Sequence, residues 1–125
     1  MYATPFTDIG GRVVGDPDAL ARRLLNVKAL LFDWDGVFNS GEKGQVPSSF
    51  NEADSMGVNM LRYGYYLLHG VPPYTAIVTG QNNPTAVEWS RREHLHNVFY
   101  HVKNKVDLAG YLESKLGIYR DQILF

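Results

Sequence analysis

The chain has 125 residues, of which 45% are hydrophobic and 20% charged, a composition typical of one globular domain with a packed core. Its 12 basic and 13 acidic residues leave a net charge of −1, which excludes the broad positive field that binding to nucleic acid or to an anionic membrane needs. The chain has no cysteine, which rules out disulfides, thiolate metal ligands and cysteine nucleophiles and favours the cytoplasm. No stretch approaches the roughly 20 apolar residues that span a bilayer, so we expect a cytoplasmic protein with no membrane partner.

The first 26 residues are expected to form an arm and one short helix. Residues 1–15 show little periodicity and contain three glycines, which predicts an irregular segment. Asp16 followed by Pro17 is a pattern that begins helices, so we expect a helix that ends at Leu25. The main domain is then expected to cover residues 27–125.

Short apolar runs alternate with helical patterns through that domain. Buried parallel strands are expected at 27–32, 74–79, 98–101 and 122–125. Helical spacing of apolar residues predicts helices at 55–68, 83–93 and 105–116, and Gly70 and Gly117 are expected to end the first and last of them. Residues 38–50 are rich in glycine and serine and predict a short hairpin or loop. The alternation predicts an α/β domain with a mainly parallel sheet flanked by helices.

Asp33 and Asp35 follow the first apolar run and are the sharpest candidates for chemistry. A carboxylate at a strand end can attack phosphorus when a divalent cation offsets the repulsion between two anions, and a second carboxylate can protonate the departing oxygen. An oxygen-only site of this kind suits Mg²⁺, and Gly36 permits the turn that brings the second carboxylate back. Taken alone, such a pair is more often a solvated turn with local backbone hydrogen bonds.

Two other strand ends carry groups that suit a phosphoryl group. Thr79 offers a hydroxyl beside the backbone N–H of Gly80, and the helix that follows adds a favourable dipole. Lys105 offers a cation, and Lys103 competes with it for this role. Each feature alone is typical of an ordinary turn or of a solvated lysine. Because the carboxyl ends of parallel strands meet at one edge of a sheet, we expect these groups to converge there.

The four histidines have no cysteine partners, so structural or surface roles are favoured over a metal site for His69, His94, His96 and His101.

The combined motifs resemble the haloacid dehalogenase (HAD) superfamily. The resemblance is greatest to its cap-less branch, which includes 3-deoxy-D-manno-octulosonate 8-phosphate phosphatase and a domain attached to some acylneuraminate cytidylyltransferases. It rests on LFDWDGV at 31–37, on Phe50-Asn51 with Asp54 and Gly57-Val58, on IVTG at 77–80, and on Lys105 before a helix.

The resemblance implies a Rossmann-like fold and a Mg²⁺-dependent phosphatase that hydrolyses a small phosphate monoester through an aspartyl-phosphate. The implied substrate is a sugar-acid phosphate such as 3-deoxy-octulosonate 8-phosphate or a nonulosonate 9-phosphate. Asp33 would be the nucleophile and Asp35 the proton donor and acceptor, and the Asp33 carboxylate and the Asp35 carbonyl would bind Mg²⁺. The remaining implied residues are Thr79, Gly80 and Lys105 for phosphate binding, and Asn51 and Asp54 for a substrate or structural role. A homo-oligomer is also implied, specifically a tetramer in which the hairpin after the first motif helps to close a neighbour's site.

The sequence departs from the pattern of this branch in three places. Asn39-Ser40-Gly41 stands where Thr/Ser-Asp-Gly is usual, and Gln81 stands where an arginine is frequent. The fourth acidic motif of the superfamily would follow Phe125, so we expect residues 27–125 to be incomplete at the C-terminus. These departures leave a second hypothesis open, in which the chain is a catalytically impaired HAD-like module for assembly or regulation.

Overall fold

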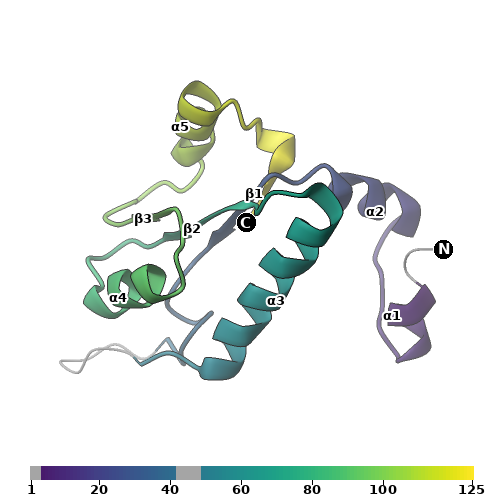
Figure 1. Cartoon of the computed structure of the whole chain (residues 1–125), viewed down its shortest axis with the longest axis horizontal. Helices are drawn as coiled ribbons and strands as arrows, with labels where there is room; N and C mark the ends of the chain where they lie inside the picture. Colours follow the sequence, from purple (N-terminus) through teal and green to yellow (C-terminus); the bar gives the residue numbers. More distant parts are fainter. Residues whose placement is uncertain (1–3, 42–48) are drawn as a thin grey trace.

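The computed structural model describes residues 4–41 and 49–125, in which short strands alternate with helices (Figure 1). The helices are α1 (Thr4–Asp8), α2 (Pro17–Leu25), α3 (Glu52–His69), α4 (Pro84–Arg92), α5 (Asp107–Leu116) and the 3₁₀ helix η1 (Arg120–Gln122). The strands are β1 (Ala29–Phe32), β2 (Tyr74–Val78), β3 (Asn97–Phe99) and β4 (Ile123–Leu124). No helix of this described part is long and apolar enough to cross a bilayer.

The four strands form one parallel sheet in the order β3-β2-β1-β4. Phe32 of β1 is in register with Ile77 of β2, and Ile77 is in register with Val98 of β3. The carboxyl ends of these three strands therefore lie at the same edge of the sheet. The predicted α/β class with a parallel sheet is confirmed.

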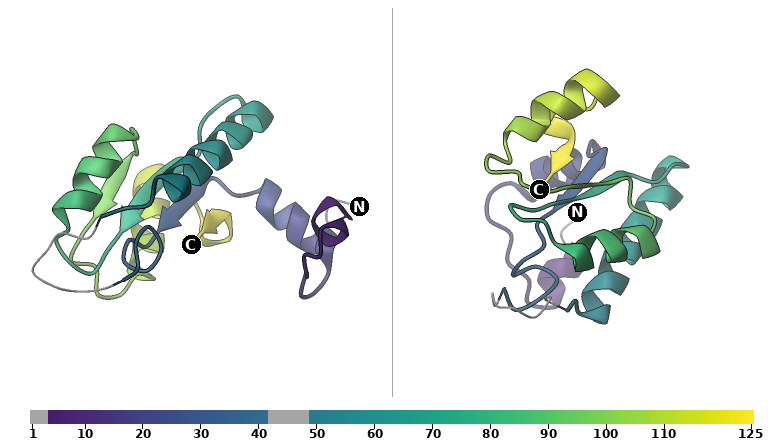
Figure 2. Two further views of the ribbon diagram at one scale, coloured as in Figure 1. Left: turned by 90° about the horizontal axis from the view of Figure 1, so that it is seen from below. Right: turned by 90° about the vertical axis from the view of Figure 1, so that its left-hand side faces the viewer.

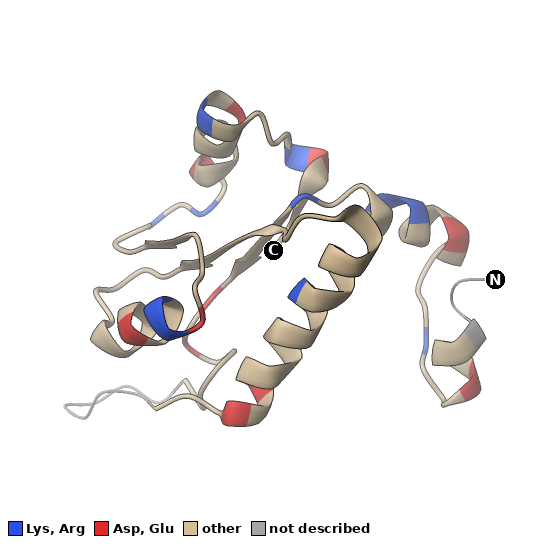
Figure 3. Ribbon diagram, in the orientation of Figure 1, with Lys and Arg blue, Asp and Glu red and all other residues tan. Residues whose placement is uncertain are grey.

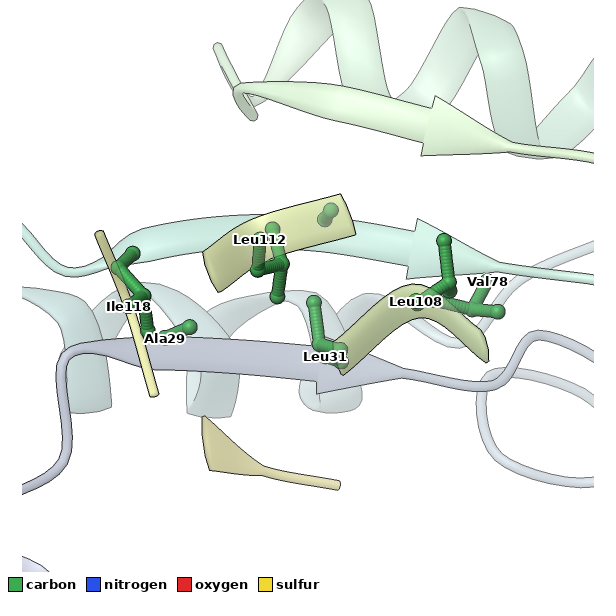
Figure 4. Close-up of a cluster of buried hydrophobic side chains, with 7 residues drawn as sticks. Ala29, Leu31, Val78, Leu108, Leu112 and Ile118 are labelled. Carbon is green, nitrogen blue, oxygen red and sulfur yellow. The ribbon is translucent and has the colours of Figure 1, made fainter. Parts of the chain in front are cut away.

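Helices cover both faces of the sheet, with α5 on one side and α3 and α4 on the other (Figure 2). Because side chains alternate along a strand, β1, β2 and β3 contribute to both layers. The layer under α5 is a cluster of aliphatic side chains (Figure 4), namely Ala29, Leu31, Ala76, Val78, Leu108, Leu112 and Ile118. The opposite layer is rich in aromatic rings and comprises Trp34, Phe38, Val58, Ile77, Ala86 and Trp89. These two layers hold the sheet edge and its following loops in place.

The predicted helix caps are present. The side chain of Asp16 accepts a hydrogen bond from Asp18 N (3.0 Å) at the start of α2, and that of Asn83 accepts one from Ala86 N (3.3 Å) at the start of α4. Gly70 and Gly117 end α3 and α5 in the left-handed conformation, with φ of 73° and 64°. Glycine adopts this conformation without the steric cost that other residues meet, which is why both helices end there.

Several predicted boundaries are wrong by a few residues. Helix α3 begins at Glu52 rather than Ser55 because Asn51 caps it, its side chain accepting a hydrogen bond from Ala53 N (2.8 Å). Helix α5 begins at Asp107, so Lys105 lies in the turn before the helix and not in its first turn.

The strand boundaries also differ from those predicted. Strand β3 stops at Phe99, and His101, which was expected inside it, has a positive φ of 59° that no strand accommodates. Strand β4 is shorter than expected because Gln122 belongs to η1. The arm expected to be irregular contains α1. Most of the hairpin predicted at 38–50 lies outside the described residues, since residues 42–48 are not described.

A polar network joins α3 to α4 behind the aromatic layer. The acidic and basic side chains coloured on α3 in Figure 3 are those of Glu52, Asp54 and Arg62. Arg62 donates hydrogen bonds to Glu93 O (2.8 Å) and to His94 O (3.1 Å). Burial opposes the charge on Glu93, but hydrogen bonds from Asn59 and Arg92 outweigh it and hold the pKa of Glu93 below its ordinary value of 4.5. The network fixes α4, whose Trp89 packs in the aromatic layer.

Candidate active site

Asp33 is the first residue after β1 and lies at the carboxyl edge of the sheet. One of its carboxylate oxygens, Oδ1, accepts a hydrogen bond from the backbone N–H of Trp34 (2.8 Å). The other, Oδ2, lies 2.8 Å from Nζ of Lys105. The buried strand before it and these two contacts fix the direction of the Asp33 carboxylate.

The ion pair between Asp33 and Lys105 is partly open to solvent. The two side chains are 38% and 30% exposed, respectively. Lys105 also lies over the ring of Phe125, with 5.1 Å between Nζ and the ring centroid. Asp33 and Lys105 are 72 positions apart in the sequence and are in contact at the carboxyl edge of the sheet. Lys103, the competing lysine, is exposed, and no ion pair is recorded for it within the described residues.

Asp35 lies in the tight turn that takes the chain away from β1. The carbonyl of Trp34 accepts hydrogen bonds from Val37 N (3.2 Å) and Phe38 N (3.1 Å), and Gly36 within this turn has a φ of 80°. A positive φ at the third position is typical of a type II turn and requires glycine there. The turn keeps Asp33 and Asp35 at the same end of the sheet, with the side chain of Trp34 buried beneath them in the aromatic layer.

Thr79 and Gly80 follow β2, the strand beside β1. The register of the two strands places Thr79 one residue past the level of Asp33. Thr79 is only 2% exposed, its backbone N–H donates to Phe99 O (2.8 Å), and its carbonyl accepts from Val102 N (3.2 Å). Its hydroxyl accepts a hydrogen bond from Gln81 N (3.4 Å). The structure thus places the Thr79 hydroxyl beneath the exposed turn that begins at Gly80.

Asn51 and Asp54 lie at the start of α3, where both are exposed. Asn51 is occupied locally, because its side chain caps the helix and its backbone N–H donates to Phe38 O (2.8 Å). That backbone bond ties the start of α3 to the loop after Asp35. The structure therefore gives Asn51 a structural task, while Asp54 is an exposed carboxylate in the first turn of α3.

Asn39 was not singled out from the sequence as a site residue, yet its side chain lies in the centre of this loop. Its Oδ1 accepts hydrogen bonds from Gly36 N (3.1 Å) and Gly41 N (2.8 Å), and its Nδ2 donates to Asp35 Oδ1 (3.5 Å). The sequence signal for such a role is an asparagine two residues before a glycine, since asparagine side chains bond the backbone two residues on.

The histidines do not gather at this edge. His96 accepts a hydrogen bond from Thr75 N at Nδ1 (3.0 Å) and lies against the ring of Tyr74, at the amino end of β2. Burial lowers the pKa of His96 below its ordinary value of 6.5, which the nearby charge of Arg62 reinforces. His96 is thus a structural acceptor.

The oxygen donors at the edge fit a magnesium ion. Mg²⁺ in proteins is usually held by one or two carboxylates, with waters and substrate phosphate completing the octahedron. Asp33 and the backbone carbonyl of Asp35 are donors of this kind. Among residues 4–41 and 49–125 no group of three or more His, Cys, Asp or Glu side chains is close enough to bind a metal.

The fold and this edge together define a parallel α/β domain with a carboxylate-lysine pair where its strands end. No family model matches the chain, and no curated protein matches it in sequence. Solved structures do match.

A protein of Xanthomonas campestris is 26% identical with a TM-score of 0.72, over 87% of this chain and 58% of that one. The 3-deoxy-D-manno-octulosonate 8-phosphate phosphatase of Moraxella catarrhalis, whose structure holds a magnesium ion, a phosphate ion and a KDO molecule, is 18% identical with a TM-score of 0.71, over 86% and 61%. A protein of Legionella pneumophila described as a HAD-superfamily hydrolase is 21% identical with a TM-score of 0.65, over 85% and 59%.

The chain thus has the fold of the HAD-superfamily phosphatases and, within them, of the 3-deoxy-D-manno-octulosonate 8-phosphate phosphatases. The resemblance predicted from the motifs is confirmed at the level of the fold. The chain spans about three fifths of the length of these three structures, which it covers to 58%, 61% and 59%.

Proposed function

We propose that the chain belongs to a Mg²⁺-dependent phosphatase that hydrolyses a small phosphate monoester. The observation that carries the proposal is the 2.8 Å contact between Lys105 and Asp33 at the carboxyl edge of the sheet. Phosphoryl transfer requires a nucleophile whose negative charge is offset and a cation that stabilises the phosphoryl group during transfer. Asp33 offers the nucleophile and Lys105 the cation, from distant parts of the chain.

In the proposed reaction Asp33 attacks phosphorus, and the bond between phosphorus and the leaving oxygen breaks. Asp35 gives its proton to that oxygen, so the alcohol departs neutral and the phosphoryl group is left on Asp33. Asp35 then takes a proton from water, which attacks the aspartyl-phosphate, releases phosphate and restores the Asp33 carboxylate. The Asp33 carboxylate and the Asp35 carbonyl would hold a Mg²⁺ ion, which would supply positive charge that offsets the repulsion between carboxylate and phosphate.

The phosphoryl oxygens are assigned to three groups around Asp33. Lys105 offers a cation, and Thr79 and Gly80 offer a hydroxyl and a backbone N–H at the neighbouring strand end. Lys105 would exchange its contact with Asp33 for one shared with the phosphoryl group, which a side chain 30% exposed is free to reach. Thr79 is 2% exposed, so its hydroxyl would act from below the turn.

For the substrate we propose a sugar-acid phosphate, either 3-deoxy-octulosonate 8-phosphate or a nonulosonate 9-phosphate. The first of these rests on the likeness to the Moraxella catarrhalis enzyme, and the second on the motif resemblance to the domain attached to some acylneuraminate cytidylyltransferases. A tetramer is proposed from the motif resemblance to the cap-less branch, and light scattering of the purified protein tests it. A cytoplasmic location is proposed because the chain has no cysteine.

Phosphate release from a panel of sugar phosphates, measured with Mg²⁺ and with EDTA, tests the activity. We expect release that requires the metal and that is lost in Asp33→Asn. Asp121→Asn is the matched control, because Asp121 is exposed and precedes β4, at the opposite edge of the sheet. Release in EDTA, or full activity of Asp33→Asn, contradicts the proposal. Inactivity of the native chain with every substrate favours the alternative of an assembly or regulatory module.

A further inference from the structure

The loop after β1 is organised around one amide side chain, that of Asn39. Three hydrogen bonds meet there: Oδ1 accepts from Gly36 N (3.1 Å) and from Gly41 N (2.8 Å), and Nδ2 donates to Asp35 Oδ1 (3.5 Å). The amide therefore contacts the loop at its beginning and at its end, and it also contacts the Asp35 carboxylate just before the loop. Asn39 is half-buried, whereas Gly36 and Val37 are exposed.

The two glycines at the ends of the loop are close to each other. A Cβ added to Gly41 would lie 3.4 Å from the Cα and 3.4 Å from the N of Gly36. Both glycines have positive φ, 80° at Gly36 and 75° at Gly41. Two N–H groups thus point to one acceptor, and Asn39 Oδ1 closes residues 36–41 into a ring.

The closed loop lies next to the carboxylate of Asp35. Asp35 lies on a turn, where a side chain has more freedom than on a strand. Proton transfer to a leaving oxygen requires a carboxyl group held within hydrogen-bonding distance in a defined direction. With Oδ1 of Asn39 fixed by two backbone groups, the direction of Nδ2 is fixed as well, and Nδ2 lies beside Asp35.

We infer that Asn39 is a positioning residue that orients the Asp35 carboxylate for protonation of the leaving group. The inference rests on the proposed function, because it concerns the proton donor of that reaction. Asn39 acts through Asp35 and needs no contact with the substrate. A residue that merely held the loop together would slow the first step alike with all substrates. A residue that orients the proton donor slows the first step, in which the leaving group departs, chiefly with substrates whose leaving group needs a proton.

Two substitutions separate the contacts of Asn39. Asn39→Asp keeps an oxygen for the two glycine N–H groups but replaces the donor beside Asp35 by a second carboxylate. Asn39→Ala removes all three bonds. The matched control is Asn59→Asp, which makes the same change beside Glu93, whose Oε2 accepts from Asn59 Nδ2 at 2.6 Å, in the network between α3 and α4.

The assay compares two kinds of substrate. The leaving group of 4-nitrophenyl phosphate departs as a stable anion. The leaving groups of the alkyl phosphates, namely glycerol 3-phosphate and the sugar phosphates of the panel, are alkoxides that need a proton. For Asn39→Asp we expect kcat/KM with the alkyl phosphates to fall by roughly 10- to 100-fold, a large part of the usual effect of general acid catalysis, and kcat/KM with 4-nitrophenyl phosphate to stay within about 3-fold. The comparison uses kcat/KM because it reports the step in which the leaving group departs, whereas kcat also includes the attack of water, which is common to all substrates. Asn59→Asp should leave the ratio of the two rates unchanged.

Amide hydrogen exchange supplies a readout that does not depend on turnover. The N–H groups of Gly36 and Gly41 should stay protected in Asn39→Asp and lose protection in Asn39→Ala. Equal losses of kcat/KM with both kinds of substrate, or unchanged exchange at both glycines in Asn39→Ala, overturn the inference while the proposed function stands. A native protein that releases no phosphate from any substrate overturns the proposed function, and the inference with it.

Discussion

Replacing Lys105 by methionine should separate stability from activity. Methionine keeps the apolar stem over the ring of Phe125 and removes the charge 2.8 Å from Asp33. The two side chains are 30% and 38% exposed, so water screens their attraction, and pairs of this kind contribute about 0–1 kcal/mol to folding. Loss of the cation from the Phe125 ring adds about 0.5–1 kcal/mol at an exposed position. The free energy of unfolding should therefore fall by less than about 2 kcal/mol.

The expected effect of Lys105→Met on catalysis is larger. A group that stabilises charge developing in the transition state contributes about 3–4 kcal/mol, or roughly 10²- to 10³-fold in kcat. Urea unfolding and phosphate release on the same preparations measure the two quantities. Lys103→Met is the control, since it removes an exposed charge two residues away and should change neither by much. An unfolding free energy lowered by more than about 3 kcal/mol, or a kcat within about threefold of native, would refute this assignment of Lys105.

Three further predictions concern the framework that holds the site. Leu112 of α5 is fully buried in the aliphatic layer, so Leu112→Ala should lower the unfolding free energy by about 2–5 kcal/mol. Leu116→Ala, at a residue 47% exposed in the last turn of α5, should cost under about 1 kcal/mol, and equal losses in urea unfolding would contradict the packing of α5 described above. Gly36→Ala should cost about 1–2 kcal/mol through its φ of 80° alone, because an added Cβ meets no atom within 4 Å; unchanged stability would argue against the turn. The lowered pKa of Glu93 means that its contribution to stability is present above pH 4.5 and is lost as the pH falls through the folded-state pKa, so Glu93→Gln should flatten the acid limb of stability against pH. An acid limb of the same slope in Glu93→Gln and the native protein would show that another carboxylate causes it.

Local signals predicted the elements of the fold well wherever the cause of an element lies within a few residues. Asp16-Pro17 and Asn83-Pro84 begin helices because cap and proline act on the adjacent turn, and Gly70 and Gly117 end them for an equally local reason. The less accurate predictions depend on distant contacts. Strand β4 has two residues because, in the described part of the chain, it pairs with β1 at Ala29 and Leu30 alone.

Local signals also led to most residues of the candidate site, whose roles remain a proposal. Asp33, Asp35, Thr79 and Lys105 were selected because each follows a predicted strand and because the motifs resemble those of a known superfamily. The choice of Lys105 over Lys103 as the partner of Asp33 depends on the path of the chain between β3 and α5, which no local pattern specifies. Asn39 was overlooked because its importance lies in three contacts that exist only once the loop has closed.

The amino-acid sequence alone specifies the fold class. The alternation of apolar runs with helical patterns is enough to specify a parallel α/β domain, because burial on both faces and capping act locally. The tertiary structure decided which polar groups meet. Parallel strands bring their carboxyl ends to one edge whatever their distance along the chain, so the contact between Asp33 and Lys105, and the direction in which Asn39 holds Asp35, follow from the register of the sheet and the closure of a loop.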